Sequence, residues 1–516
     1  MNAKPQPRKI MNAKPQPRII TTLLLVGLAC ACSDGGSPSE PIAVEDTQSR
    51  IARIAESLQR PLVVEGRDVE RWDIEDRMRQ FNVPGVSVAV IDGGRLAWAH
   101  AWGVKEAGGD DPVTTETLFQ AGSVSKPVAA LLALSLVGDG KLTLDQPVNE
   151  ILETWQVPDN EFTRVQPVTL RHVLTHQGGF TPFGYLIQRK EGSVPGMAEL
   201  LRGGIHDWPA VTVEFVPGSR HAYSNAGYCV LQLVLEETSG ESLHELAVKK
   251  MFGPLGMGNS TFDEPLDETH LAAAACGHER KRTGESREAV PVDGKADIAP
   301  GATGGLWSTP SDLAAVAVEV IQAWGGESEK IVTHDLAHQF LSPQVADEGL
   351  GINVDGEGTA LRARHGGGMT GFICLLVFYP ETGQGAVVMT NSDGGRWLQQ
   401  ELIAAIAAEY AWSGYPVRRS VGTATADQLD ELAGVYTLDA SPEYAFTVRI
   451  ENGKAFGQIN QYPPFELAPT TDRDLYILAR ESLEIFFLRD EDGSIVQVEL
   501  RRAGDSGNRY SRQAGP

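Results

Sequence analysis

Apolar and polar residues alternate most regularly around residue 88, where Val86, Val88 and Val90 point to one side of an extended segment. The alternation breaks at Asp92-Gly93-Gly94 and resumes in RLAWAHAWG, which predicts two antiparallel strands joined by a hairpin turn. A second pair of strand-like apolar runs flanks PETGQG within residues 371–390. Strands are therefore predicted at both ends of one long region.

Helical periodicity appears beside these strands. VERWDIEDRMRQF at 69–81 and RWLQQELIAAIAAEYAW at 396–412 both have apolar positions at helical spacing. About 270 residues of helix and loop separate the two strand pairs. We therefore predict an α+β domain over residues 66–415, with an antiparallel sheet built from both ends and a helical insertion between them.

The pattern changes near residue 425, where short strands follow one another with hairpin turns at Asn452-Gly453 and Asp492-Gly493. We expect a linker over 416–426 and a small all-β domain over 427–516. None of the residues in this small domain forms a catalytic constellation. Its expected role is to pack against or shield the large domain, with binding of a carbohydrate or a partner as the alternative.

The chain begins with a ten-residue near-duplication, MNAKPQPRKI and MNAKPQPRII, so either Met1 or Met11 is the true start. A basic segment, the eleven apolar residues IITTLLLVGLA and small residues with cysteine predict an export signal over 1–32. The cysteines resemble a lipoprotein lipidation site at Cys30 or Cys32, and a plain secretory signal cut near Ala31 is the alternative. Residues 33–65 are predicted to be a flexible tether, and the protein a periplasmic or cell-envelope lipoprotein.

Net charge limits the partners that this chain can bind. Its 44 Lys and Arg against 68 Asp and Glu give a formal charge of -24, which repels nucleic acid and anionic lipid. No apolar run in the body of the chain reaches the length of a membrane span, so contact with a membrane is expected only through the N-terminal anchor. The three remaining cysteines are isolated and are expected to be buried structural residues.

The segment GSVSK at 122–126 is the first candidate for chemistry. At positions i and i+3 of a helix, Ser123 and Lys126 lie one turn apart, within hydrogen-bonding reach. A lysine made neutral by burial can accept the proton of such a serine. Pro127 restricts the pair to the start of a helix, where free N–H groups favour developing negative charge.

Two later segments supply further polar groups. PGSRHAYSNAGY contains Tyr223 and Asn225, and RARHGGGMTGF contains His365 followed by three glycines before an apolar strand. SxxK, YxN and HxG in this order resemble the serine β-lactamase and penicillin-binding protein superfamily. The resemblance covers about residues 70–415 and includes the blocks TLFQAGSVSK, VTLRHVLTHQGGF and PGATGGLWSTPSDLA.

The resemblance implies a role for each matched residue. Ser123 would be the acylated nucleophile and Lys126 its proton acceptor, while Tyr223 would pass a proton to the leaving group and help activate the deacylating water. Asn225 would bind Lys126 and the amide carbonyl of the substrate. The implied reaction is acyl transfer through a covalent intermediate, on a small-molecule or peptidoglycan-like substrate.

The resemblance also assigns the third motif. His365 would orient the substrate, and Gly366 and Gly367 would let the strand approach the ligand without a Cβ. The backbone N–H groups of Ser123 and Gly368 would form the oxyanion hole. His365 stands where many β-lactamases of the superfamily have lysine, and no KTG occurs in the chain, so carboxylate-bearing substrates lose a permanent cation unless His365 is protonated or Arg364 assists.

We therefore expect an esterase or DD-carboxypeptidase-like serine hydrolase with weak or no β-lactamase activity. The alternatives are a non-catalytic penicillin-binding receptor or scaffold and a true β-lactamase. No cofactor or metal is expected, because neither the His172 and His176 pair nor the His334 and His338 pair has an identifiable third ligand. The substrate and the oligomeric state are open from the sequence.

Overall fold

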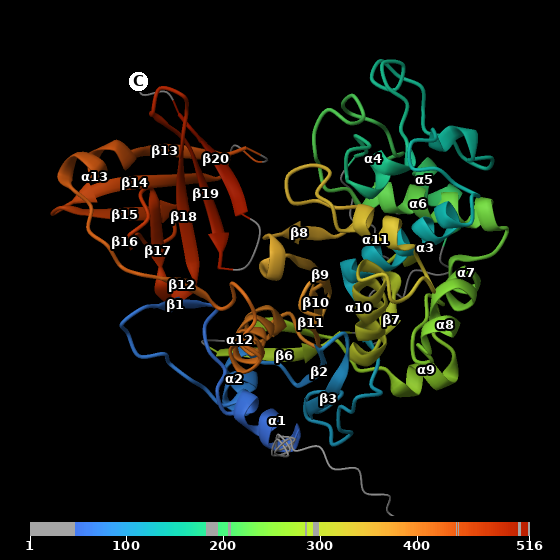
Figure 1. Cartoon of the computed structure of the whole chain (residues 1–516), viewed down its shortest axis with the longest axis horizontal. Helices are drawn as coiled ribbons and strands as arrows, with labels where there is room; N and C mark the ends of the chain where they lie inside the picture. The colour runs from blue at the N-terminus through green and yellow to red at the C-terminus, as the bar shows by residue number, and fades with distance from the viewer. Residues whose placement is uncertain are drawn as a thin grey trace, which may run out of the picture. The chain divides into compact units, whose positions relative to one another are not determined.

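A six-stranded antiparallel sheet is the central element of the large domain, in the order β3-β2-β11-β10-β9-β8 (Figure 1). The computed structural model describes residues 47–181, 195–204, 208–283, 286–292, 299–439, 441, 443–503 and 507–513. The strands of this sheet are β2 (Gly85–Asp92), β3 (Arg95–Gly103), β8 (Asn353–Asp355), β9 (Arg362–Met369), β10 (Phe372–Tyr379) and β11 (Gln384–Thr390). Strands from both ends of the domain form one sheet, so the predicted fold class is confirmed.

The alternation seen in the sequence places the two faces of β2 in different cores. Val86, Val88 and Val90 pack in one cluster with the apolar side of the helix that follows β11, whereas Ala89 and Ile91 belong to the other cluster. The helices of the first face are α1 (Thr47–Ala55), α2 (Ile74–Phe81) and α12 (Gly395–Glu409). The main helices of the second face are α3 (Ser125–Gly138), α6 (Asn225–Ser239) and α10 (Pro310–Trp324).

The helical insertion between β3 and β8 also contains short elements. Its remaining helices are α4 (Leu170–Leu174), α5 (Met197–Arg202), α7 (Leu243–Ala247), α8 (Gly253–Leu255), α9 (Glu268–Ala273) and α11 (His334–Phe340). Two small strand pairs accompany them: β4 (Phe119–Gln120) with β7 (Trp307–Ser308), and β5 (His278–Thr283) with β6 (Ser286–Pro291). The first pair matters for function, because β4 leads directly into GSVSK.

The C-terminal part forms a closed eight-stranded antiparallel barrel (Figure 1). Its elements are α13 (Ala426–Leu432), β13 (Gly434–Leu438), β14 (Ala445–Glu451), β15 (Lys454–Ile459), β16 (Phe465–Pro469), β17 (Leu475–Leu478), β18 (Leu483–Arg489), β19 (Ile495–Arg502) and β20 (Gly507–Arg512). Aromatic side chains, among them Tyr436, Phe446 and Phe487, fill its core. The Tyr436 hydroxyl donates to the carbonyl of Leu432 at 2.8 Å, which ties α13 to the barrel.

The predicted tether over 33–65 is wrong from Thr47 onward. Helix α1 buries Ile51 and Ile54, whose spacing is that of one helix face, in the core beside α12. β1 (Leu62–Val64) pairs in parallel with β12 (Val417–Arg419), so the predicted linker 416–426 contains a paired strand. The predicted export signal, including Cys30 and Cys32, lies outside the described residues.

Cys229, Cys276 and Cys374 are buried free thiols, as predicted. Within the described part of the chain, no helix has both the length and the apolar character required to cross a bilayer.

Candidate active site

The nucleophile segment is a short 3₁₀ turn, η1 (Gly122–Val124), immediately before α3. The Ser125 hydroxyl holds this turn, because it donates to the carbonyl of Gly122 at 2.7 Å and accepts from the amide of Leu306 at 3.1 Å. Gly122 has a φ of +54°, a conformation that favours glycine. Ser123 thus lies immediately before the N-terminus of α3, in a turn whose backbone is held by these hydrogen bonds.

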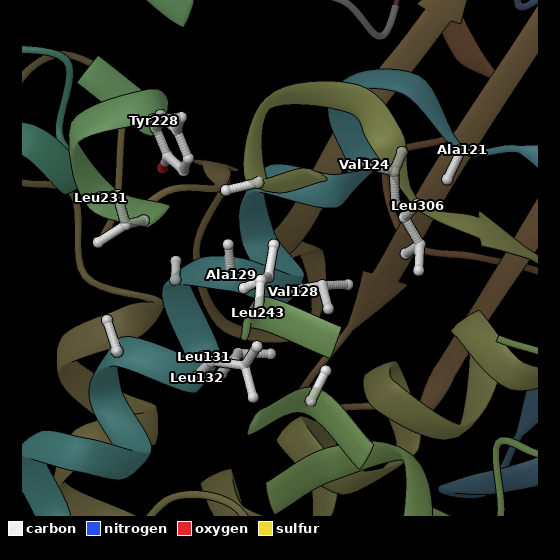
Figure 2. Packing of buried hydrophobic residues seen from close by; sticks show 14 of the residues in the cluster. Ala121, Val124, Val128, Ala129, Leu131, Leu132, Tyr228, Leu231, Leu243 and Leu306 are labelled. Carbon is white, nitrogen blue, oxygen red and sulfur yellow. The ribbon is translucent and has the colours of Figure 1, made fainter. Parts of the chain in front are cut away.

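Lys126 is fully buried in the first turn of α3. Its Nζ lies 3.1 Å from the Oγ of Ser123 and donates to the carbonyl of Thr303 at 2.7 Å. Val128 and Ala129, which follow Lys126 in the helix, are buried in the same apolar cluster as Tyr228 (Figure 2). Burial among them lowers the pKa of Lys126 to about 7, so a large neutral fraction exists at physiological pH.

Tyr223 lies on the other side of the nucleophile. Its hydroxyl is 3.0 Å from the Oγ of Ser123, and its ring centroid is 5.0 Å from the Nζ of Lys126. Tyr223 is 43% exposed, and the desolvation of its hydroxyl in the cleft raises the pKa of Tyr223 to about 12, so the phenol keeps its proton at neutral pH. The ring of His176 packs against it at a centroid distance of 4.2 Å, and Nδ1 of His176 accepts from the amide of Ser224 at 3.1 Å.

Asn225 is the first residue of α6 and is half-buried. The described hydrogen bonds of Lys126 go to Ser123 and to the carbonyl of Thr303, and none of them joins it to Asn225. The predicted contact between Asn225 and Lys126 is therefore absent from the described hydrogen bonds, in which Ser123 and the Thr303 carbonyl are the partners of the amine. The role of Asn225 toward the substrate stays a prediction.

The third motif lies on β9, next to η1. A Cβ on Gly122 would meet the amide nitrogen of Gly368 at 2.6 Å, so that amide lies beside the residue preceding Ser123. A Cβ on Gly367 would lie 1.9 Å from the carbonyl oxygen of Ala121, whereas one on Gly366 would meet nothing within 4 Å. Gly367 is thus required by contact with the nucleophile segment rather than with a ligand, which corrects the expected reason for this glycine.

His365 is buried on the same strand, with Nδ1 2.8 Å from the carbonyl oxygen of Gly366. Burial, followed by the nearby Lys126, lowers the pKa of His365 to about 3. The imidazole is therefore neutral at physiological pH. Arg364 is no substitute cation, because its Nε is 3.2 Å from a carboxylate oxygen of Asp355.

Ser123, Tyr223 and His365 line one cleft of about 1060 Å³, together with the glycines of β9. Residues of the barrel line it as well, including Asp439, Glu499 and Arg509. A further wall comes from residues 346–348, which connect α11 to β8. The structure thus brings together most of the predicted site residues, and it adds walls that the motifs did not indicate.

The two histidine pairs considered for metal binding have other partners. Nδ1 of His172 accepts from the amide of Thr169 at 3.2 Å, and Nδ1 of His176 accepts from the amide of Ser224. Nδ1 of His334 and Nε2 of His338 lie 3.1 and 3.2 Å from the carbonyl oxygens of Ala323 and Trp324. Among the residues that the structure describes, no group of three or more His, Cys, Asp or Glu side chains is arranged to hold a metal ion.

The sequence interpretation missed three residues that shape this site. Thr303 and His176 both lie in blocks that carried the family resemblance, PGATGGLW and HVLTHQGG, but only as structural segments. Glu348 follows no recognised motif. A buried acidic residue in a loop leaves no periodic signal by which a sequence could reveal it.

Comparisons with known proteins identify a family and relatives of this chain. A family model described as Beta-lactamase matches residues 73–411. Penicillin-binding protein 4 of Amycolatopsis lactamdurans is 29% identical over 236 residues, covering 45% of this chain and 58% of that protein. A D-aminopeptidase of Brucella anthropi is 24% identical over 322 residues, covering 61% of this chain and 58% of that protein. Each match thus spans little more than half of the relative's length.

The fold is also shared with solved structures. The octameric penicillin-binding protein homologue from Pyrococcus abyssi superimposes with a TM-score of 0.54 at 21% identity. The match covers 85% of this chain and 98% of that one, which is more of this chain than residues 73–411 span. The likeness in fold therefore extends beyond the region that the family model matches.

Proposed function

The chain belongs to the Beta-lactamase family, and from that premise we propose that it is a serine hydrolase acting on esters, amides or D-alanyl peptides through an acyl-enzyme. One observation carries the proposal. The Oγ of Ser123 has a buried amine of lowered pKa 3.1 Å away and a protonated phenol 3.0 Å away. A hydroxyl between a base and an acid suits both steps of acyl transfer.

In the first step of the proposed reaction, neutral Lys126 accepts the hydroxyl proton of Ser123, and the Oγ of Ser123 bonds to the carbonyl carbon of the substrate. The amides of Ser123 and Gly368 hold the oxyanion. The bond to the leaving group then breaks, and Tyr223 gives that group its proton and regains one from Lys126. Water attacks the acyl group in the second half, which releases the acid and restores the Ser123 hydroxyl.

The substrate preference follows from charge. His365 is neutral and Arg364 is bound to Asp355, so neither offers a free cation to a carboxylate. Esters, amides and peptides bound through neutral groups are favoured over penicillins for this reason. Arg396 also lines the cleft and is the guanidinium to substitute if a carboxylate substrate is nevertheless cleaved well.

The test is a panel on the purified full-length chain: p-nitrophenyl acetate, a D-alanyl-D-alanine peptide, a D-aminoacyl anilide and a penicillin. We expect turnover of at least one of the first three, weak or no turnover of the penicillin, and loss of activity in Ser123→Ala. The intact mass of the protein should rise by one acyl group with a slow substrate. An acylated protein that never turns over would favour the receptor alternative, and activity unchanged in Ser123→Ala would refute the proposal.

We also propose that the protein is exported and reaches the cell envelope through a lipid on Cys30 or Cys32. Metabolic labelling with a palmitate analogue tests this. Label retained when both cysteines are replaced by serine would refute it.

A further inference from the structure

The wall of the cleft at residues 346–348 is a tight turn. The amide of Glu348 donates to the carbonyl of Val345 at 2.9 Å, and Ala346 has a φ of +49°. A non-glycine residue adopts this conformation only where its surroundings hold it. Ala346, Asp347 and Glu348 of this turn line the same cleft as Ser123.

Glu348 is an unusual residue for such a wall. It is only 4% exposed, and one carboxyl oxygen, Oε2, accepts from the side-chain amide of Asn353 at 2.8 Å. The other oxygen, Oε1, has no hydrogen-bond partner within the described part of the chain. Burial, and then repulsion from Asp347, raise the pKa of Glu348 to about 8. The carboxyl therefore retains its proton at neutral pH.

Within the described part of the chain, no lysine or arginine forms a salt bridge with this acidic pair, although Lys126 attracts Glu348. Asp347 is half-exposed and makes no ion pair there. His221 lies 3.9 Å from Oε2 of Glu348, but burial lowers its pKa, and Lys126 is engaged with Ser123 and Thr303. Two carboxyl groups that lack a salt bridge to any described lysine or arginine therefore line the cleft of the nucleophile, where a ligand can supply a positive charge.

Two other acidic residues of the cleft, Asp355 and Glu499, differ in this respect. Asp355 binds Arg362 and Arg364, and Glu499 binds Arg509 at 3.1 Å. These carboxylates already have guanidinium partners. Asp439 also lines the cleft without a described guanidinium partner, but it is exposed and accepts from the side-chain amide of Gln497 at 3.0 Å. The 346–348 turn differs from all three residues because it holds a buried carboxyl oxygen, Oε1 of Glu348, that has no hydrogen-bond partner among the described residues.

We propose that Asp347 and Glu348 form the subsite for the ammonium group of the substrate, so that the enzyme prefers aminoacyl amides, esters or peptides with a free α-amine. The inference rests on the proposed acyl transfer at Ser123 and names its substrate class. Asp347 contacts the ammonium at the cleft surface. Glu348 lies behind it, where a bound ammonium favours loss of the Glu348 proton to solvent and so provides the second charge. An N-acylated substrate has no ammonium group, so this pair does not strengthen its binding.

The test compares kcat/KM for D-alanine p-nitroanilide and N-acetyl-D-alanine p-nitroanilide. We expect the kcat/KM of the wild type to be about tenfold or more higher for the free amine, because one hydrogen bond to a charged group contributes a free energy of that size. Asp347→Asn and Glu348→Gln should each lower that ratio by about tenfold. Asp439→Asn is the matched control: it removes one charge from the same cleft, where Asp439 accepts from Gln497, and should keep the wild-type ratio.

Inhibition of p-nitrophenyl acetate hydrolysis provides a second measurement that does not require anilide turnover. D-alanine amide should inhibit more strongly than its N-acetyl form, and Asp347→Asn, at a half-exposed position that is safe for folding, should abolish the difference. If D-alanine amide and its N-acetyl form inhibited the wild type equally, the proposed ammonium subsite would be wrong, but the proposed serine hydrolase activity would stand. Absence of any Ser123-dependent hydrolysis would instead overturn the proposed function.

Discussion

Gly367→Ala is the substitution that most directly tests how the site is assembled. The added Cβ would lie 1.9 Å from the carbonyl oxygen of Ala121 and 3.3 Å from the Cβ of Cys374 on the neighbouring strand. Real contacts of this kind do not fall below 3.0 Å, so β9 and the nucleophile segment must separate by about 1.1 Å. The amide of Ala121 is itself bound to the carbonyl of Leu306 at 2.8 Å, which opposes that movement.

The magnitude follows from that displacement. Forcing an extra carbon into a packed interior costs about 1–3 kcal/mol of folding stability. A misplacement of about 1 Å between Ser123 and the amide of Gly368 costs about 10²-fold in rate, because the oxyanion donors no longer meet the developing charge. The loss should therefore appear mainly in kcat, since the geometry of the reacting atoms changes more than the walls of the cleft.

Gly366→Ala is the matched control on the same strand, because its Cβ would meet nothing within 4 Å. Urea unfolding and p-nitrophenyl acetate kinetics should be measured for both variants and the wild type. Gly366→Ala should keep the wild-type midpoint, and any change in its kinetics should appear in KM, since the methyl group enters the cleft. If Gly367→Ala had wild-type kcat and a wild-type midpoint, the inferred contact between β9 and the nucleophile segment would be wrong.

Three further predictions concern the base, the acid and the scaffold. The kcat/KM for a neutral ester should rise with pH about tenfold per unit below pH 7 and level off above it, because Lys126 acts in its neutral form and its pKa is lowered to about 7; a rise that continues past pH 9 would contradict this. Tyr223→Phe should lower kcat by about 10²-fold or more in stopped-flow assays, most for amides, whose leaving group needs a proton. Glu401→Gln should destabilise the fold by about 3 kcal/mol in urea without changing the kinetics of the folded enzyme, because it leaves the buried Arg77 without its charged partner.

The sequence predicted those parts of the fold that a local pattern encodes. The hairpin at 85–103 and the helix that follows β11 are periodic, and their burial repeats the pattern. Helix α1 was missed although Ile51, Ile54 and Leu58 have helical spacing, because the Ser-, Pro- and Gly-containing segment before it dominated the interpretation of 33–65. Closure of the barrel could not be predicted, because it depends on the pairing of β13 with β20 across some 70 residues.

For the site, the sequence indicated candidate catalytic residues, but it did not indicate how far burial shifts their pKa values. SxxK predicted the distance between Ser123 and Lys126, since helix geometry fixes it. The neutrality of His365 and the proton on Glu348 come from burial by segments far apart in the chain, which no spacing records. The roles proposed for individual residues in the reaction remain predictions for the experiments above.

The hydrophobic run PVAALLALSLV is itself part of the chemistry. Its residues are almost all buried and carry the first turn of α3 into the core with them, and that burial is the largest cause of the lowered pKa of Lys126. A surface lysine with the ordinary pKa of 10.5 would be neutral in fewer than about one molecule in a thousand at pH 7, whereas a pKa of about 7 makes it neutral in about half. The same apolar pattern that forms the core thus raises the fraction of active base by roughly three orders of magnitude, so a polar substitution in this turn should lower the rate even where the fold survives.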